Sequence, residues 1–548
     1  MVKVNRRGRQ YEGLPASSAI AMAVMEHSGI RRMIDSSVEY DSERKLTPGM
    51  AVKAMIAPIF DARKKMPLTG IRHFHGASPT DLLFGKGVVN ESLNDNALAR
   101  NLDSLYDAGL EELFRKCSSA MKRRFGFDSK IRHMDATNYS IHSVKPEDSW
   151  IGEAVPAFGG NAKDGRNDLL RYSAATVTDG DRILEYCKAY SGNASDAVMN
   201  RNTLDFLKAS LDPRENTVVA DCKLVNGQLI TELNGMGMGF ISRLPSSFSD
   251  KLRDSIVDSA MNGVMDRSSI AGYETYETES ETTCGKLRLI AYRSPKDARK
   301  AMDYLERQGK RDAERLFKGF AKREYACEAD AVKAFDDAVA KHRGSAYVVT
   351  GTPVRIEETV RRDTRGRPPK GSEAPATNVI WKIDVSMHFD RKRADELADE
   401  HGISVIVTNL PFATADHVNM RHGATTDTVL GLYLDQFKAE HTYRLMKSGM
   451  GVDSVYVHTP TRANALLFVV AIATLVSSVM DAMLRRNGKG RRKTVRQICI
   501  EIQSAILEYR RDEDTLSVLG PAGAEDGVFS YLDKIDLDSS LLLDIFDG

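Results

Sequence analysis

The chain has 548 residues, more than one hydrophobic core usually supports, so about three or four domains are expected. Hydrophobic residues make up 42% of the sequence and charged residues 28%, a composition that excludes a disordered protein. The 77 basic and 76 acidic side chains leave a formal net charge of +1, so only the distribution of charge can indicate a polyanionic partner.

The cysteines and the N-terminus indicate a reducing compartment. The six cysteines include no close pair, which argues against a disulfide framework and against a Cys-based zinc site. The basic residues of MVKVNRRGRQ are not followed by the apolar run of a secretory signal, so export is not expected. We therefore expect a cytoplasmic protein.

Residues 1–126 are expected to form a helical N-terminal domain that binds DNA or mediates dimer formation. From about residue 12, apolar residues recur every three or four positions, for example in LNDNALARNLDSLYDAGLEELFRKCSSAMKRRF. The last turn of this run brings Lys122, Arg123 and Arg124 together. Such a cluster indicates either a solvated helix end or a contact with DNA.

Between residues 127 and 245 the pattern changes to short β-like runs, beginning with KIRHMDATNYSIHSV. Three strands in hairpin succession are followed by a helix that Ser195 or Asp196 can cap. The apolar strand NTVVADC, a second helix and the strand GFISRLP come next. This βββαβαβ order predicts an α/β fold built on a mixed sheet.

The remaining chain is predicted to hold an insertion, the end of the sheet domain and a tail. Residues 246–400 mix charged helical stretches with strand-like runs and are interpreted as a mixed α/β insertion. Residues 401–484 begin with a returning strand and a helix. They end in an apolar stretch with about sixteen uncharged residues before Asp481, fewer than the roughly 20 that span a bilayer, so a buried core helix and no membrane span are predicted. Residues 485–548 are interpreted as a basic and then acidic C-terminal tail.

Three carboxylates can converge in such a sheet. Asp135 lies within the first strand and Asp221 ends the fourth, so both acids meet at one edge if these strands are neighbours. Glu440, on the helix after the returning strand, can complete a cage of oxygen ligands of the kind that Mg²⁺ requires. Two such ions can activate a nucleophilic oxygen and stabilise the leaving oxygen of a phosphoryl transfer. Each acid by itself is equally well explained as a turn former, a cap or a solvated side chain.

Around these acids the sequence resembles the DDE transposases of prokaryotic insertion sequences, in the long-chain branch of the insertion-sequence-4-like group marked by a YREK signature. The helix matches the spacing Y-x2-R-x3-E-x6-K of that signature at Tyr433, Gln436 in place of the arginine, Glu440 and Lys447. The first-strand D-x-T of the family is matched at residues 135–137, and KDGRNDL, YSGNASD and VVADCKL resemble further segments. The resemblance covers about 130–245 and 400–470, and the front helical region also resembles the N-terminal domain of this branch.

The resemblance implies an RNase H-like catalytic core that uses two Mg²⁺ ions, with Mn²⁺ as a substitute, to cut and join DNA. In this interpretation Asp135, Asp221 and Glu440 are the catalytic metal ligands. The implied partners are the terminal inverted repeats of a mobile element and a target duplex, held by a homodimer at the nucleoid in the cytoplasm.

The same helix is expected to contact DNA. Arg444 and Lys447 lie one and two turns beyond the catalytic glutamate, where they can face phosphate oxygens. Tyr433 falls near the same helix face and either contacts DNA or packs in the core. At position 436 this chain has glutamine where the family has arginine, so it stays open whether this position contacts DNA.

The insertion carries two further DNA-binding candidates. Arg365 and Arg367 lie in an RGRP core like that of an AT-hook, which places arginine in a narrow A·T-rich minor groove. A flexible basic linker would have the same composition. Trp381 is an aromatic side chain that could hold a flipped base, although a tryptophan in a strand also suits core packing.

A basic cluster at 485–496 includes Arg491, Arg492 and Lys493. It predicts salt-sensitive phosphate binding, and a solvated loop is the alternative.

The leading interpretation is a cut-and-paste DNA transposase. One alternative is an RNase H-like nuclease that cuts without strand transfer. The other is a non-catalytic DNA-binding protein descended from a transposase, against which the intact set of two aspartates and one glutamate argues.

Overall fold

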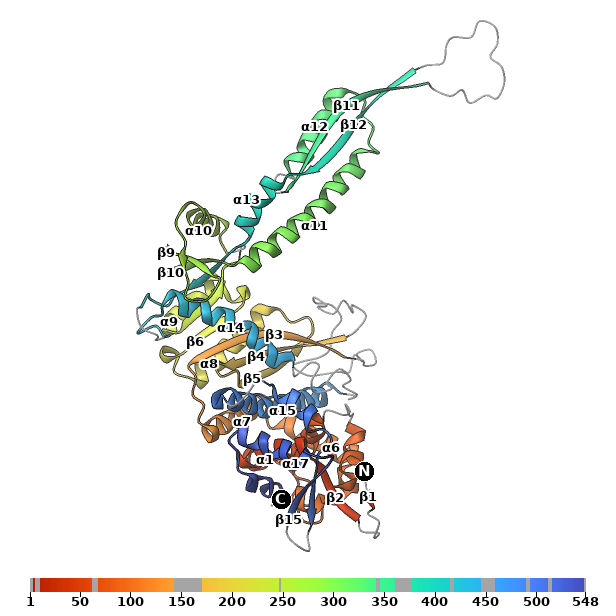
Figure 1. Ribbon diagram of the computed structural model, residues 1–548, viewed down its shortest axis with the longest axis vertical. Coiled ribbons are helices and arrows are strands. Elements are labelled where there is room, and N and C mark those ends of the chain that lie inside the picture. Colours follow the sequence, from red (N-terminus) through yellow and green to blue (C-terminus); the bar gives the residue numbers. More distant parts are fainter. Residues whose placement is uncertain are drawn as a thin grey trace, which may run out of the picture. The chain divides into compact units, whose positions relative to one another are not determined.

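The computed structural model describes residues 3–4, 10–61, 68–141, 170–245, 248–341, 345–359, 377–413, 418–444, 459–488, 493–510 and 515–546. The chain divides into two compact units. The first comprises Met1–Ser242, Thr282–Gly285 and Thr408–Gly548, and the second comprises Arg243–Glu281 and Lys286–Val407. Figure 1 shows the elements of both units, and each unit is described by itself.

The front of the first unit is helical, as its apolar spacing predicts. Local signals set the helix ends: the Thr47 side chain accepts a hydrogen bond from Met50 N, the Asn94 side chain accepts one from Ala97 N, and Gly126 ends the last helix at a φ of 69°. The helices are α1 (Ala16–His27), α2 (Ile30–Ser37), α3 (Pro48–Ile56), α4 (Ile71–Phe74), α5 (Thr80–Phe84), α6 (Asp95–Asp107) and α7 (Leu110–Phe125).

A mixed sheet follows, with the strand order β5-β4-β3-β6-β7 within the first unit. Its strands are β3 (Ile131–Ile141), β4 (Leu170–Asp179), β5 (Leu184–Ser191), β6 (Thr217–Ala220) and β7 (Gly239–Arg243). The strand β4 is antiparallel to β3 and β5, whereas β6 is parallel to β3 and β7. Helix α8 (Asp196–Ser210) lies between β5 and β6 in the chain, and α9 (Gly227–Met236) lies between β6 and β7. The predicted α/β fold on a mixed sheet and its βββαβαβ order are confirmed.

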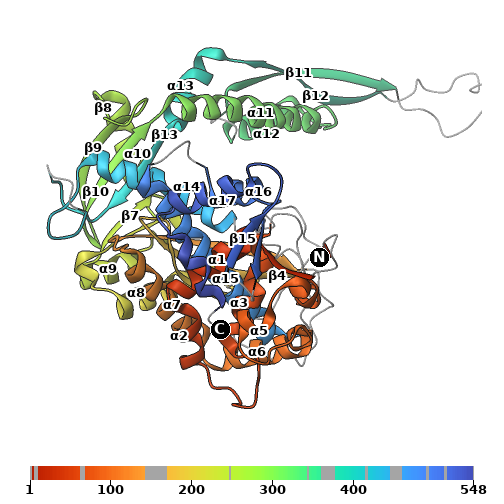
Figure 2. The ribbon, with the colours of Figure 1, turned by 60° about the horizontal axis from the view of Figure 1, so that its bottom comes forward.

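The C-terminal segment is folded into the first unit, so the predicted tail at 485–548 is wrong. Helix α16 (Val495–Glu501), strands β14 (Ile506–Arg510) and β15 (Thr515–Leu519) and helix α17 (Ala524–Lys534) all belong to it. The strand β14 pairs antiparallel with β2 (Gln10–Pro15), in the sheet order β1-β2-β14-β15 with β1 at Lys3–Val4. Figure 2 shows the red and dark blue ends of the chain side by side in this region.

The reason for this error is the distance in sequence between the partners. Apolar residues of the segment, such as Leu507, Val528 and Ile545, are scattered among charges. They are buried in one core with residues of α1, α3 and α15, which lie far away in the chain. The charge pattern alone therefore suggested a solvated tail.

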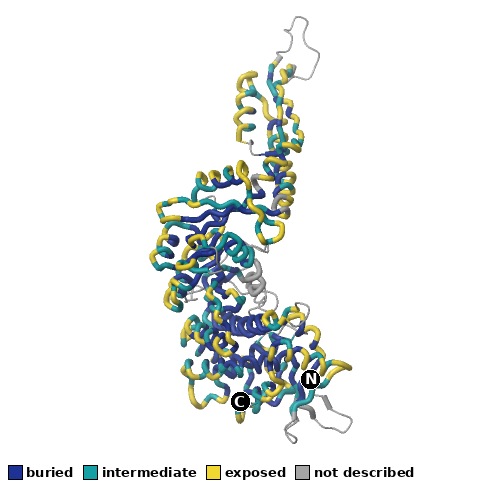
Figure 3. The backbone as a smooth tube through the Cα atoms, turned by 60° about the vertical axis from the view of Figure 1, so that its left-hand side comes forward, coloured by how far each residue is buried: buried dark blue, intermediate teal, exposed yellow. Residues whose placement is uncertain are grey.

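The apolar stretch at 465–484 lies in α15 (Pro460–Asn487), which is the centre of this core. Its most apolar 18-residue window has a mean hydropathy of 2.2 and is 89% buried inside the first unit. The helix packs against α3, α6, α7 and β5. Figure 3 shows the buried residues of this region in dark blue. The prediction of a buried core helix is confirmed.

Asp481, the charged residue of this apolar stretch, should make the stability of the protein depend on pH. Its Oδ1 accepts a hydrogen bond from Val495 N at 2.8 Å, at the start of α16. Burial raises the pKa of this carboxyl to about 6, while that hydrogen bond opposes the increase. Between about pH 4 and pH 6 the folded chain therefore keeps a proton that the unfolded chain has lost, and the free energy of unfolding falls as pH rises.

We expect this loss to reach about 3 kcal/mol above pH 6, and we expect Asp481→Asn to remove it because the amide oxygen still accepts from Val495 N. Urea unfolding at a series of pH values checks the slope. Asp107→Asn, at an exposed position of α6, is the matched control and should keep the slope of the parent protein. Equal slopes in the parent and in Asp481→Asn would contradict the prediction.

The second unit contains a four-strand section and a long hairpin. The strand order in the section is β13-β10-β9-β8, and β10 is buried along residues 287–292, as an inner strand requires. These strands are β8 (Asp266–Arg267), β9 (Glu274–Thr282), β10 (Gly285–Arg293) and β13 (Ile403–Thr408). Two helices, α10 (Asp250–Asn262) and α13 (Arg391–His401), contact each other in this unit.

The hairpin of the second unit joins β11 (Tyr347–Thr359) and β12 (Thr377–Phe389), which pair antiparallel along their whole length. Helices α11 (Pro295–Phe320) and α12 (Glu328–Ala340) pack against it, as Figure 1 shows. Phe320, Phe335, Val349 and Ile383 form the core between the helices and the hairpin. The insertion therefore has a hydrophobic core of its own.

Candidate active site

Asp135 lies within β3, where the adjacent strand β4 holds its backbone. Its carbonyl oxygen accepts a hydrogen bond from Thr176 Oγ1 at 3.1 Å, and Asp135 is paired with Thr176 in the antiparallel register. The carboxylate is partly buried, and Oδ1 accepts from Ala136 N at 2.8 Å. The D-x-T segment thus places a carboxylate on a strand inside the sheet.

Asp221 is the first residue after β6 and begins a short 3₁₀ turn, Cys222–Leu224. Its Oδ1 accepts a hydrogen bond from Lys223 N at 3.0 Å, and its carbonyl oxygen accepts from Ser242 Oγ at 2.6 Å. Asp221 is exposed. Asp221 thus caps the turn, which is a common role of an aspartate at a strand end. Only Oδ1 is used in this contact, so Oδ2 can still take part in metal binding.

The register of β3 and β6 relates the positions of the two aspartates. In this parallel pair Ile131 is opposite Thr217 and His133 is opposite Val219. Asp135 and Asp221 each lie two residues beyond the last of these pairs. Neighbouring strands lie about 4.8 Å apart, and residues in step on parallel strands point to the same face of a sheet. The backbone of Asp135, within β3, and that of Asp221, directly after β6, therefore lie on adjacent parallel strands.

Gln436 connects helix α14 (Thr426–Arg444) to the backbone beside both aspartates. Its side chain is 9% exposed. With the amide turned so that both of its groups find complementary partners, Nε2 donates to Ala220 O at 3.1 Å and Oε1 accepts from Asp221 N at 3.0 Å. In the opposite orientation Nε2 reaches Met134 O at 3.4 Å. The Gln436 side chain is therefore buried against the strands, and the DNA contact left open for this position stays a prediction.

Glu440 lies one turn further along α14. Four residues separate it from Gln436, so its backbone lies on the same helix face, about 6 Å along the axis. The side chains of Glu440 and Arg444 lie outside the described part of the structure, as does all of Lys447. Tyr433 is partly buried on the same helix. The helix that carries the predicted third ligand thus contacts the strands that carry the first two.

Gln436 should stabilise the attachment of α14 to the sheet. Replacing it by leucine removes the side-chain partners of Ala220 O and Asp221 N, of which Ala220 is buried, and should lower the free energy of unfolding by about 1–3 kcal/mol. Chemical denaturation measures this change. Gln228→Leu, on the exposed face of α9, provides the control and should stay within about 0.5 kcal/mol of the parent. A Gln436→Leu variant as stable as this control would count against the two hydrogen bonds.

His133 and Asp435 lie close to each other near this site and were not identified from the sequence. His133 is 4% exposed on β3, and burial lowers its pKa to about 4, against an opposing effect of the nearby Asp435 carboxylate. This imidazole is therefore neutral at physiological pH and adds no positive charge beside Asp135. No local pattern marks His133, because its burial depends on α14, some 300 residues later in the chain.

Within the described ranges, no three side chains of His, Cys, Asp or Glu are grouped closely enough to hold a metal ion. The predicted set has two described members, Asp135 and Asp221, and a third whose side chain is not described. Both described members offer carboxylate oxygens, which suit Mg²⁺ or Mn²⁺ better than a soft metal.

The basic residues at the end of α7 have structural roles. Lys122 is buried and forms ion pairs with Asp179, at 2.8 Å, and with Glu185. Arg124 donates a hydrogen bond to the His27 ring at 3.0 Å. The alternative of a DNA contact is therefore wrong for Lys122, whose ammonium group is neutralised inside the first unit.

Trp381 packs in the hairpin core of the second unit. It is opposite Arg355 in the β11–β12 register, and its backbone exchanges two hydrogen bonds with Tyr325, at 2.8 and 2.9 Å. The partly buried ring contacts the cluster around Phe320 and Ile383. This position agrees with the core-packing alternative and does not support a role in holding a flipped base.

The other predicted DNA contacts are mostly outside the described residues, which applies to Arg365, Arg367, Arg491 and Arg492. Lys493 is described and forms an ion pair with Glu501, with N–O distances of 2.7 and 2.8 Å. Its charge is thus partly neutralised by α16.

Comparisons with known proteins show a similarity to one family profile and to solved structures. A family profile described as "Domain of unknown function (DUF4277)" matches residues 17–119, in the helical front of the first unit. No curated protein matches the sequence. Among solved structures, the cryo-EM structure of a piggyBac transposase synaptic complex with hairpin DNA is 7% identical, with a TM-score of 0.40 over 90% of this chain and 82% of that chain. The profile covers a minor part of the chain, and the structural similarity is weak.

Proposed function

We propose that the chain is a DNA transposase that cuts the terminal inverted repeats of an insertion sequence and joins them to target DNA. The observation that carries the proposal is the parallel pairing of β3 with β6, whose last paired residues, His133 and Val219, each lie two positions before Asp135 and Asp221. The contact of Gln436 with β6 supports it, because it holds the helix of Glu440 against the same strands. The YREK-like spacing on that helix adds support from the sequence.

In this proposal Asp135, Asp221 and Glu440 hold two Mg²⁺ ions, for which Mn²⁺ can substitute. When bound, such ions polarise the scissile phosphate and lower the pKa of the attacking oxygen. The protein residues hold and orient these ions and the DNA. The sheet fixes the separation of the two aspartates, and α14 supplies the third carboxylate from across the site. Arg444 and Lys447 would face phosphate oxygens beyond it.

The proposed partners are two element ends and a target duplex, bound by a homodimer at the bacterial nucleoid in the cytoplasm. A dimer is proposed because transposition must bring two ends together. The terminal repeats can be found in the DNA that flanks the coding region, where a short inverted repeat inside a direct target duplication is expected.

The test is a cleavage assay with the purified full chain and a duplex that carries these repeats. We expect Mg²⁺-dependent cutting at the repeat ends, loss of cutting in EDTA, recovery with Mn²⁺, and joined products when target DNA is added. Cutting without joined products would support the RNase H-like nuclease instead. Binding of the repeats without cutting under any of these conditions would support a non-catalytic DNA-binding protein.

A further inference from the structure

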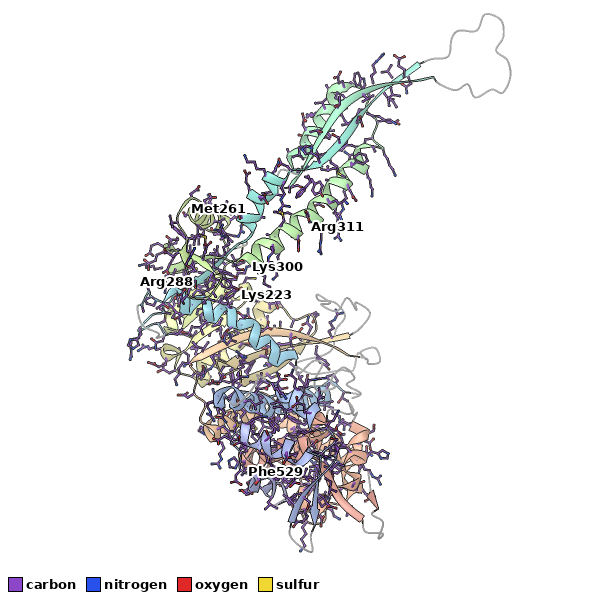
Figure 4. All side chains as sticks on the ribbon, in the orientation of Figure 1. Lys223, Met261, Arg288, Lys300, Arg311 and Phe529 are labelled. Atoms are coloured by element: carbon purple, nitrogen blue, oxygen red, sulfur yellow. The ribbon has the colours of Figure 1, made fainter. Side chains whose placement is uncertain are left out.

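Helix α11 of the second unit carries a stripe of cationic side chains that no predicted site includes. Its members are Lys296, Lys300, Arg307, Arg311 and Lys318, which follow one another at intervals of four, seven, four and seven residues. At 3.6 residues per turn these intervals place all five within about 60° around the helix axis. Figure 4 labels Lys300 and Arg311 on this helix. We call these five residues the α11 stripe.

The α11 stripe faces solvent. All five side chains are exposed, and none of them forms an ion pair with another described residue. The opposite side of the helix is the buried one, where Ala301, Leu305, Ala313 and Phe320 contact the hairpin and α13. The cations are thus not used to hold the fold together.

Charge and length suit the stripe to a duplex. From Lys296 to Lys318 the helix rises about 33 Å, close to the 34–36 Å of one turn of B-DNA. Asp303 and Glu314 are the acids on the same arc, so cations outnumber acids there by five to two. A regular row of unpaired cations over one helical turn is complementary to a regular row of phosphates.

Other polyanionic partners fit the helix less well. A helix that lies on a membrane needs a free apolar face, whereas the apolar face of α11 is already buried against the hairpin. Tyr304 and Phe317, which are 61% and 42% exposed, lie on either side of the stripe and do not form a continuous apolar face.

We infer that the α11 stripe is a second DNA-binding surface, one that binds the phosphates of a duplex without reading its sequence. The choice of DNA over other polyanions rests on the proposed function. Because every phosphate contact releases counterions, the stripe should contribute to affinity in a manner that depends on salt concentration.

The test compares two triple variants of the full chain on a random duplex of about three helical turns without terminal repeats. The stripe variant carries Arg307→Gln, Arg311→Gln and Lys318→Gln. The matched control carries Lys251→Gln, Lys333→Gln and Lys392→Gln, which remove three exposed, unpaired cations from α10, α12 and α13 of the same unit. Both variants change the net charge equally and leave buried contacts intact.

Affinity is measured between about 50 and 200 mM salt, and the slope of log K against log salt concentration is compared. We expect the stripe variant to have a slope shallower by about 2.7, from three contacts at about 0.9 each, and the control to keep the slope of the parent. Equal slopes in the stripe variant and the parent, or the same change in the control, would overturn the inference.

Two further measurements distinguish this inference from binding of another polyanion and from the proposed catalytic activity. If the stripe variant keeps the parent slope on DNA but loses binding to phosphatidylserine vesicles or to an RNA duplex, the surface serves another polyanion and the inference is overturned. If the parent fails to cut repeat-bearing DNA with Mg²⁺ while the slopes differ as expected, the proposed catalysis fails and the DNA-binding surface stands.

Discussion

Replacing Glu440 by glutamine should reduce metal-dependent cleavage of element-end DNA by on the order of a thousandfold or more, while DNA binding is retained. Asp221→Asn should have the same effect. Both changes keep the shape of the side chain and remove one negative charge, which a site for two divalent cations requires. Binding should persist because it depends on cationic surfaces elsewhere in the chain.

The measurements are single-turnover cleavage and an equilibrium binding assay on the same duplex. Asp205→Asn, at an exposed position of α8, is the matched control, since it removes the same charge from the first unit away from the site. Full cleavage by the Glu440→Gln variant would remove that residue from the proposed site. Loss of binding together with cleavage would indicate unfolding, and circular dichroism would detect it.

Replacing Lys53 by alanine should lower the free energy of unfolding by about 3–5 kcal/mol, because it leaves buried polar groups without their partner. Lys53 is 0% exposed, and its ammonium group lies 2.7 Å from Glu26 Oε1. It also donates to Leu83 O and Ile545 O, both at 2.9 Å. One side chain thus connects α3 to α1, to α5 and to the last turn of the described chain.

Urea unfolding of the full chain measures this loss. Lys45→Ala removes the same side chain at an exposed position before α3 and should change stability by less than about 0.5 kcal/mol. Equal free energies of unfolding for the Lys53→Ala and Lys45→Ala variants would contradict the role assigned to the buried ammonium group. Deleting the residues that follow Asp544 should lower the free energy of unfolding by part of the loss expected for Lys53→Ala, because Ile545 O accepts a hydrogen bond from Lys53.

The site was predictable from sequence to the extent that its signals are local. The segment around Asp135 has the alternation of a strand, and Asp221 directly follows a short apolar run, so both positions in the sheet could be expected. The order of strands and helices follows from the same local patterns and predicts a mixed sheet. The structure shows that β3 and β6 are neighbours in it.

The sequence did not indicate the contacts of side chains whose partners lie far away in the chain. Gln436 stands where the family signature has an arginine, and its side chain is buried against residues 220–221. Lys122 belongs to a basic cluster, and its ammonium group is neutralised by acids on β4 and β5. In both cases a polar side chain is buried because a distant backbone or carboxylate satisfies it, which no local pattern records.

The sequence by itself determined the helices of the front region and the order of strands and helices between residues 131 and 243, because caps, turns and apolar periodicity act within a few residues. Only the tertiary structure decided that the C-terminal residues complete the front of the first unit, that Gln436 joins α14 to β6, and that a row of cations on α11 is left facing water. These outcomes depend on which surfaces meet after the chain has folded. Burial and charge pairing between distant residues therefore set the roles that composition alone left open.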